Sequence, residues 1–292
     1  MRTLLAAMCL TASALTHAGD VASTASPLPF KPRTYALVSA LGEQFSAVTE
    51  VMSTGSHLPP YRRRSLDASG NLLNLLVLRQ LEQQVGAMAP DSKRVFISFP
   101  ESKIPRAPPN RRAQATFDAV VAELQSHPER ANWDRILLVT PAYRAQDKDG
   151  MGAKLQGMGL FIEPMCQSNV DSCANNTAPL SGPMAERPDG SMEAANGYIA
   201  PYFYITIWEL DAATFSVLEK LEVFEHHRML GDDNRPGAVL ETVDRTRLAT
   251  QVSKLVGTSI RDALRQTELA GHVEARLLSD APNPAPKPPA AN

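Results

Sequence analysis

Helical and strand-like apolar patterns alternate along the first half of the chain, and their order constrains the fold more than any other feature of the sequence. Apolar residues recur at steps of three and four over 71–88 and over 110–126, which is the period of an amphipathic helix. A short β-prone run follows each of these segments, at 95–99 and at 136–140. Because 136–140 is apolar throughout, we expect it to form a strand that is buried on both faces of a sheet.

Further strands are expected before the first helix. The runs 34–40 and 45–52 are rich in β-prone residues and are separated by Gly42, so we predict that they form a hairpin. The run 62–66 is a candidate third strand.

The second half of the chain closes with a longer hairpin and a helix. The runs 202–210 and 215–224 flank a polar turn, which predicts the hairpin. The segment 244–268 carries one apolar helical face, and Asp244 is a candidate N-cap. Together these elements predict an α/β fold in which helices pack on a mixed β-sheet, with an α+β arrangement as the alternative.

Composition divides the chain into one domain and its flanking segments. We expect a signal peptide at 1–18, a flexible lead-in at 19–32, a single α/β domain at 33–275 and a disordered Pro- and Ala-rich tail at 276–292. Within the domain, 142–200 is rich in Gly, Met, Asn and Pro, and we interpret it as a long irregular insertion.

The first 18 residues have the layout of a secretory signal. Arg2 gives a positive start, 4–15 is largely apolar, and small residues precede Gly19. The apolar run is too short to span a membrane by itself, and Cys9 lies inside it rather than at its end, where a lipidated cysteine is expected. We therefore expect cleavage near Ala18 and a periplasmic or secreted protein without a stable membrane anchor; a retained anchor and lipidation are the alternatives.

The net charge argues against a nucleic acid as partner. The chain has 29 basic and 31 acidic residues, and the signal contains one of the arginines, so the mature chain carries a charge of about −3. A nucleic-acid-binding domain shows a strong basic excess instead. The arginine-rich stretches 62–64 and 111–112 are interpreted as solvated charge that flanks a strand and opens a helix; an anion site is the alternative.

Two cysteines, Cys166 and Cys173, remain after cleavage and lie in a polar segment without periodicity. In an oxidising compartment an isolated pair this close in sequence most simply forms a disulfide, which we predict here. A soft metal site that also uses Met165 is the alternative, but the nearby sequence offers no third and fourth ligand. We expect no metal site and no cofactor.

No catalytic or phosphate-binding motif stands out in the sequence. The Gly-x-Ser-x-Gly elbow, the His-Glu-x-x-His motif and the Gly-x-x-x-x-Gly-Lys-Ser/Thr loop are all absent. His57 lies in a segment rich in aromatic and basic residues, where a site could form. A hydrolase site built from His57, Asp147 and Asp149 is therefore one hypothesis.

The strand predicted at 202–210 suggests a different kind of site. Its alternation places Tyr202, Tyr204 and Trp208 on one face, and aromatic side chains at an accessible surface favour binding. The same pattern also fits a face that is buried in the core, and both interpretations remain open.

Three stretches of the chain carry a family resemblance. They are Gly-Ser-His-Leu-Pro-Pro-Tyr at 55–61, Gly-Met-Gly-Leu-Phe-Ile-Glu-Pro at 157–164 and Ala-Pro-Tyr-Phe-Tyr-Ile at 200–205. These stretches resemble exported proteobacterial proteins of unassigned function. The resemblance implies an exported location and carries over no catalytic residue.

The leading hypothesis is an exported periplasmic protein that binds a ligand or a partner and is not an enzyme. The partner would be a protein or a small molecule of the cell envelope. The alternatives are a periplasmic hydrolase with its site near His57, and a metal-handling protein that uses the methionines of 151–192 with the two cysteines.

Mass spectrometry tests both the prediction of export and the prediction of the disulfide. Mass spectrometry of the protein purified from the periplasm of a bacterial host should find an N-terminus at Gly19, and peptide mapping without reductant should find Cys166 linked to Cys173. An intact N-terminus on Met1, or two free thiols in the exported protein, would contradict the corresponding prediction.

Overall fold

A single long strand, β9 (Tyr198–Asp211), organises the sheet and is buried along nearly its whole length. The computed structural model describes residues 32–50, 61–68, 71–143, 155–163, 182–195, 197–231, 243–267 and 269. Eight strands form one mixed sheet around β9. One edge of β9 pairs with β10 (Val217–His226) in the antiparallel hairpin that the sequence predicts.

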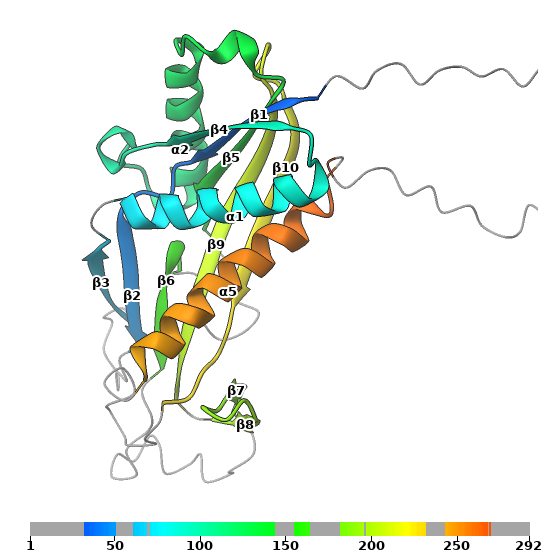
Figure 1. The fold of residues 1–292 in the computed structure, drawn as a ribbon. Coiled ribbons are helices and arrows are strands. Elements are labelled where there is room, and N and C mark those ends of the chain that lie inside the picture. The colour runs from blue at the N-terminus through cyan, green and yellow to red at the C-terminus, as the bar shows by residue number, and fades with distance from the viewer. Residues whose placement is uncertain are drawn as a thin grey trace, which may run out of the picture. The chain divides into compact units, whose positions relative to one another are not determined.

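The other edge of β9 is shared by two groups of three strands, which we call the first and second wings (Figure 1). In the first wing, β5 (Arg135–Pro141) pairs antiparallel with the C-terminal half of β9. β1 (Thr34–Ser39) lies parallel to β5, and β4 (Lys93–Ser98) lies parallel to β1. As expected for a strand of this composition, β5 is buried on both faces.

The second wing pairs with the N-terminal half of β9. β6 (Gly157–Glu163) is antiparallel to β9, and β2 (Gln44–Glu50) is parallel to β6. The edge strand of this wing is β3 (Tyr61–Asp67), which is antiparallel to β2 and confirms the candidate third strand.

The hairpin predicted from 34–40 and 45–52 is wrong. β5 and β6 are both antiparallel to β9 and therefore run in the same direction, as do their parallel neighbours β1 and β2. Residues between β1 and β2 carry the chain from the first wing into the second, with Gly42 at φ +86°, instead of turning it back. The β-prone composition of the two runs is correct, but it does not determine their partners.

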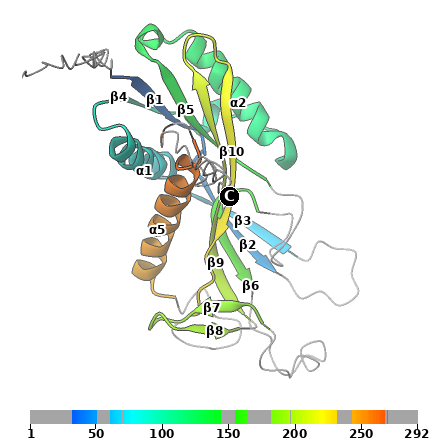
Figure 2. The ribbon, with the colours of Figure 1, turned by 90° about the vertical axis from the view of Figure 1, so that its right-hand side faces the viewer.

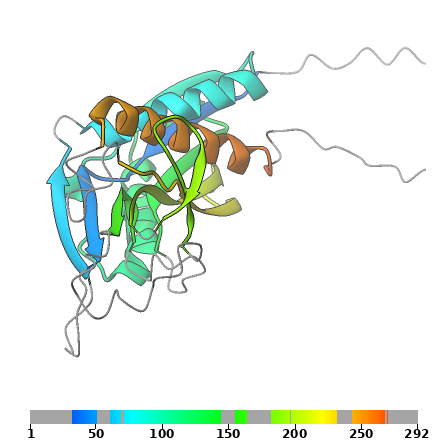
Figure 3. The same cartoon turned by 90° about the horizontal axis from the view of Figure 1, so that it is seen from below.

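Helices cover both faces of the sheet (Figure 2). α1 (Leu72–Met88) and α5 (Arg245–Leu264) pack together on one face, which Figure 3 shows from below. α2 (Pro109–Gln125) covers the first wing on the opposite face. The three helices agree with the sequence predictions, and the Asp244 side chain caps α5 by accepting the Thr246 N–H at 2.9 Å. The observed architecture is the predicted single α/β domain with a mixed sheet.

Smaller elements complete the described chain. Two short 3-10 helices, η2 (Glu101–Lys103) and η3 (Arg130–Asn132), flank α2. β7 (Met184–Glu186) and β8 (Met192–Ala194) form a separate two-stranded sheet. Within the described part of 142–200, β6, β7, β8 and the start of β9 are strands, and β6, which contains the β-prone run 160–162, lies inside the main sheet.

Several sequence predictions lie outside the described residues. They concern the signal peptide, the lead-in as far as residue 31, and the tail at 276–292. Across the part of the chain that the structure describes, no helix is both long and apolar enough to cross a membrane.

A buried amide joins the first wing to the start of α1. The Asn74 side chain is fully buried, and its Oδ1 accepts the Ser39 hydroxyl at 2.8 Å and the Leu41 N–H at 3.0 Å. Its Nδ2 donates to Asn71 Oδ1 at 2.7 Å and to the Phe99 carbonyl at 3.2 Å. All four hydrogen-bonding positions of the amide are used, so Asn74 fixes where β1 and β4 end relative to α1.

Replacing Asn74 with alanine would leave the Leu41 N–H and other buried polar groups without this partner. Each unsatisfied buried polar group costs about 1–3 kcal/mol, so we expect Asn74→Ala to lower the free energy of unfolding by at least about 3 kcal/mol. Chemical denaturation measures this loss. Asn110→Ala, at an exposed position of α2, is the matched control and should change stability by less than about 0.5 kcal/mol. Equal effects at both positions would contradict the role of the buried amide.

Candidate functional site

The two wings meet at a discontinuity that we call the notch. Ile205 of β9 pairs with Pro141 of β5, whereas the adjacent Tyr204 pairs with Gly157 of β6. At this point the Ala142 N–H donates to the Tyr204 carbonyl at 2.9 Å, and the Gly157 N–H donates to the Ala142 carbonyl at 3.2 Å. The C-terminal end of β5 therefore meets the N-terminal end of β6, and the two strands follow one another along the same edge of β9.

The notch lies where a ligand site is expected in a sheet of this kind. It is at the carboxyl ends of the parallel strands β1 and β5. α1 leads from β3 of the second wing to β4, α2 leads from β4 to β5, and the two helices lie on opposite faces of the sheet. Open α/β sheets bind ligands at such a point, because successive connections leave in opposite directions and open a crevice.

A cavity of about 180 Å³ occupies the notch. Its apolar wall is buried and comes from the segment after β1 and from α1, β5 and β6, through Leu41, Leu73, Pro141 and Met158. Its polar wall comes from the second wing and α2, through Gln44, Ser46, Arg63, Ser65, Arg112 and Gln156. The cavity thus combines a closed apolar side with an opposite side that is rich in hydrogen-bonding groups.

Two arginines give the cavity its positive charge. Arg63 of β3 lies opposite Val48 of β2, which places its side chain on the cavity face of the second wing. It is exposed and forms no ion pair or hydrogen bond within the described part of the chain. Arg112, in the first turn of α2, is three-quarters buried and lies 3.4 Å from Glu101 Oε1.

The Glu101 carboxylate interacts both with Arg112 and with the segment between β1 and β2 that passes from one wing to the other. Its Oε2 accepts the Glu43 N–H at 2.9 Å, and its carboxylate lies against Gly42, where a Cβ would overlap it. Glycine at position 42 therefore provides both the positive φ and the space for this carboxylate. One carboxylate beside two guanidinium groups leaves the region with a net positive charge.

Two buried polar groups near the cavity lack partners among the described residues. Gln156 is 7 % exposed, and its Nε2 makes no hydrogen bond. The phenolic oxygen of Tyr202 is also buried and makes no hydrogen bond of acceptable geometry. Gly159 makes room for this phenol, because a Cβ there would overlap the Ser46 carbonyl and Tyr202. Buried donors without partners are rare, so both groups require an explanation.

Burial raises the pKa of the Tyr202 phenol to about 12, while the charge of Arg63 and the polar groups of Ser46 and Gln156 act in the opposite direction. The phenol is therefore protonated at neutral pH. Together with the two guanidinium groups and the Gln156 amide, it makes the region a set of donors. The positive charge and the donors of the described walls suit the binding of an anion.

The prediction of an accessible aromatic face on β9 is wrong. Tyr202, Tyr204 and Trp208 are all buried. Trp208 packs under α2 with its ring 4.4 Å from that of Phe117 and donates to Thr140 Oγ1 at 3.0 Å. The tyrosine rings pack against each other at 5.3 Å. These three residues follow the alternative interpretation, in which the face belongs to the core.

The other predicted site residues lie outside the described residues. These are His57, Asp147 and Asp149 of the hydrolase hypothesis, and Cys166 and Cys173 of the disulfide. Both hypotheses stay predictions. Within the described ranges, no group of three or more His, Cys, Asp or Glu side chains is placed to hold a metal ion.

The arginine-rich stretches 62–64 and 111–112 are the part of the sequence that could have indicated the notch cavity, because each contributes one arginine to its lining. By sequence alone, both stretches favour solvated charge, with an anion site as the alternative. Strand alternation separates Arg63 from Arg62 and Arg64, but only the pairing of β3 with β2 shows which face meets α2 and Arg112. Gln156 had no sequence signal, since its burial depends on the contact between the wings.

No family model and no curated protein sequence matches the chain. Among solved structures, a PelC dodecamer from Paraburkholderia phytofirmans has 9% identity and a TM-score of 0.29, over 80% of this chain and 87% of that one. A Helicobacter pylori protein described as a neuraminyllactose-binding hemagglutinin homolog has 6% identity and a TM-score of 0.32, over 84% and 91%. A Xanthomonas campestris protein of the DUF330 family has 8% identity and a TM-score of 0.30, over 82% and 88%. All three are bacterial proteins, and similarity at this level identifies no function.

The raised pKa of Tyr202 predicts a pH-dependent loss of stability. An unfolded tyrosine ionises near pH 10, so between about pH 10 and 12 only the unfolded state releases this proton, and folding becomes less favourable as the pH rises. We expect wild type to lose about 1.4 kcal/mol more than Tyr202→Phe between pH 8 and pH 11. At pH 8 the phenol is protonated in both the folded and the unfolded state, so its ionisation contributes no difference between the two proteins there. Urea denaturation at both pH values measures the difference; parallel losses in both proteins would contradict the burial of this phenol.

Proposed function

We propose that the mature chain is an exported, non-enzymatic binding protein whose notch cavity holds a small anion or the anionic end of a larger ligand. The observation that carries this proposal is the convergence on one cavity of Arg63, Arg112 and the Gln156 Nε2, which has no hydrogen-bond partner among the described residues. These groups come from different elements, and all of them donate hydrogen bonds.

The chemistry of the lining favours a carboxylate or phosphate group. A guanidinium presents a planar fork of N–H donors that matches two oxygens of such a group. A partly desolvated site strengthens these charge-assisted hydrogen bonds, and Arg112 is three-quarters buried. A bound oxygen would also give the Gln156 Nε2 the acceptor that it lacks in the described residues.

The size of the cavity limits what enters it. Pockets for drug-sized ligands are about 300–1,000 Å³, whereas the notch cavity is about 180 Å³. A larger ligand would therefore place only its anionic group inside. The export part of the proposal rests on residues 1–18 and is tested by the N-terminal mass measurement described above.

Isothermal titration calorimetry of the purified mature protein tests the binding part. Sodium phosphate, sulfate and acetate are titrated separately in chloride buffer of low ionic strength. We expect at least one of these anions to bind saturably, with one site per chain. Arg63→Gln and Arg112→Gln should each weaken that binding at least about ten-fold, because a hydrogen bond to a charged group contributes about 1.5–3 kcal/mol. Binding should weaken as sodium chloride is added.

Arg64→Gln is the matched control. Arg64 neighbours Arg63 on β3 and is also exposed, but it lies opposite Ala47 on the other face of the wing, so its removal should leave the affinity nearly unchanged. Saturable binding by none of the three anions overturns the proposal. Equal weakening by Arg64→Gln and Arg63→Gln does so too, because it would indicate diffuse surface charge and not a site.

A further inference from the structure

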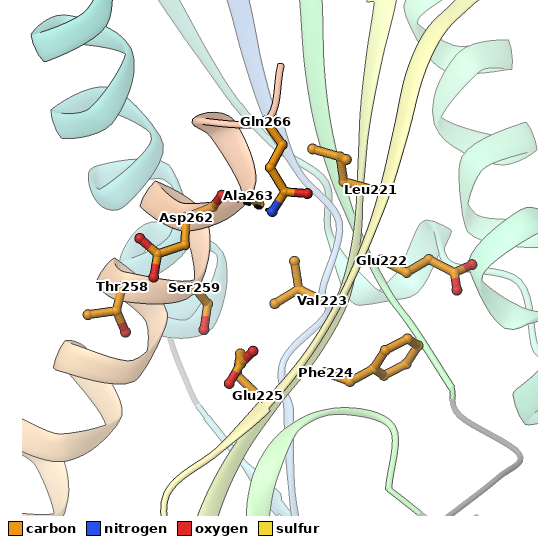
Figure 4. Close-up of a pocket in the computed structure, with 10 residues that line it drawn as sticks. All are labelled: Leu221, Glu222, Val223, Phe224, Glu225, Thr258, Ser259, Asp262, Ala263 and Gln266. Carbon is orange, nitrogen blue, oxygen red and sulfur yellow. Dashed lines mark hydrogen bonds between the residues drawn. The ribbon is translucent and has the colours of Figure 1, made fainter. Parts of the chain in front are cut away.

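A second cavity, of about 230 Å³, lies between β10 and the C-terminal half of α5 and shares no lining residue with the notch (Figure 4). Val223 and Ala263 form its apolar base. Figure 4 shows Val223 and Glu225 directed from β10 toward α5, whereas Glu222 and Phe224 point to the other side of the strand. The cavity is therefore built on the helix-covered face of the hairpin.

Ser259 supplies a buried polar group without a partner. The residue is 4 % exposed, and its Oγ makes no hydrogen bond among the described residues. A helical serine usually satisfies its hydroxyl on a backbone carbonyl of the preceding turn, as the adjacent Thr258 does with the Lys254 carbonyl at 2.9 Å. The Ser259 hydroxyl instead faces the cavity toward Glu225 (Figure 4).

The remaining polar groups of the cavity are acceptors of hydrogen bonds. Asp262 pairs with Arg261 through one oxygen at 3.0 Å, and Glu225 also interacts with other parts of the chain. A carboxylate offers about four acceptor positions, so the contact with Arg261 leaves further positions on Asp262. Gln266 uses its Nε2 to donate to the Asp262 carbonyl at 3.1 Å, which leaves its amide oxygen as the acceptor.

This lining selects the chemical class of the ligand. Negative charge on two sides and an excess of acceptors favour a cation that brings its own N–H donors. A metal ion fits less well, since no described group of three or more His, Cys, Asp or Glu side chains is placed to hold one. We propose that this cavity binds a primary ammonium group, which donates to Glu225, to Ser259 Oγ and to Asp262 or the Gln266 amide oxygen.

Two-dimensional NMR of the isotope-labelled mature protein tests this site. Titration with n-propylammonium chloride should give saturable shifts centred on the amides of Val223, Ser259 and Gln266. Tetramethylammonium chloride, which has the same charge but no N–H donor, should bind at least about ten-fold more weakly. Acetyl-glycyl-lysyl-glycine amide distinguishes the source of the group: tighter binding than n-propylammonium indicates a lysine of a protein partner, and weaker binding indicates a free amine.

Two variants and a matched control define the contacts. Ser259→Ala and Glu225→Gln should each weaken n-propylammonium binding at least about five-fold, while Glu222→Gln, a carboxylate on the same strand that points away from α5, should not. The thermal midpoint of Ser259→Ala should match or exceed that of wild type, which shows that lost binding is not lost folding. No saturable shifts, equal binding of tetramethylammonium, or equal weakening by Glu222→Gln overturns the proposal.

Discussion

The backbone pairing of β9 is the constraint on which the rest of the structure depends. A strand has only two edges, and β10 occupies one of them from Tyr202 to Leu210, on both sides of the point where the wings meet. Both wings must therefore share the remaining edge, one after the other, with the change of partner between Tyr204 and Ile205. Because buried backbone groups must be hydrogen-bonded, this arrangement fixes the positions of both wings and leaves the notch between them.

Some polar groups at the notch form hydrogen bonds that fix the surrounding chain, whereas another polar group near the cavity has no hydrogen-bond partner among the described residues. Asn74 uses all its hydrogen-bonding positions to fix the end of β1, and Glu101 holds the crossing chain at Glu43. By contrast, the Gln156 Nε2 is buried and has no hydrogen-bond partner among the described residues, and the Ser259 hydroxyl repeats this feature in the second cavity. Proteins tolerate such local costs chiefly where function requires them. The two cavities differ in charge, since one is lined by arginines and the other by carboxylates.

A comparison of particular elements shows which features of the fold can be predicted from local sequence patterns. The three helices follow from the period of their apolar residues, and the strands β3, β5, β9 and β10 follow from β-prone or continuously apolar composition, because both signals are local. The β1–β2 hairpin fails, because β-propensity does not select a strand's partner. The strand β6 begins with glycines that look like a loop, yet Gly159 is needed there to admit Tyr202. The alternation of β9 fits both an exposed and a buried aromatic face. The packing of α2 and the neighbouring strands shows that this face is buried.

The sequence by itself determined the kinds of secondary structure, most of their boundaries, the cap at Asp244 and the near-neutral charge that argues against a nucleic-acid partner. It also carries the predictions of export and of the disulfide. Only the tertiary structure decided which strands pair, and hence that Arg63 on one wing and Arg112 on a distant helix line the same cavity. The physical reason is that periodicity and capping are properties of neighbouring residues. A cavity, by contrast, exists only where segments far apart in the chain pack incompletely against one another.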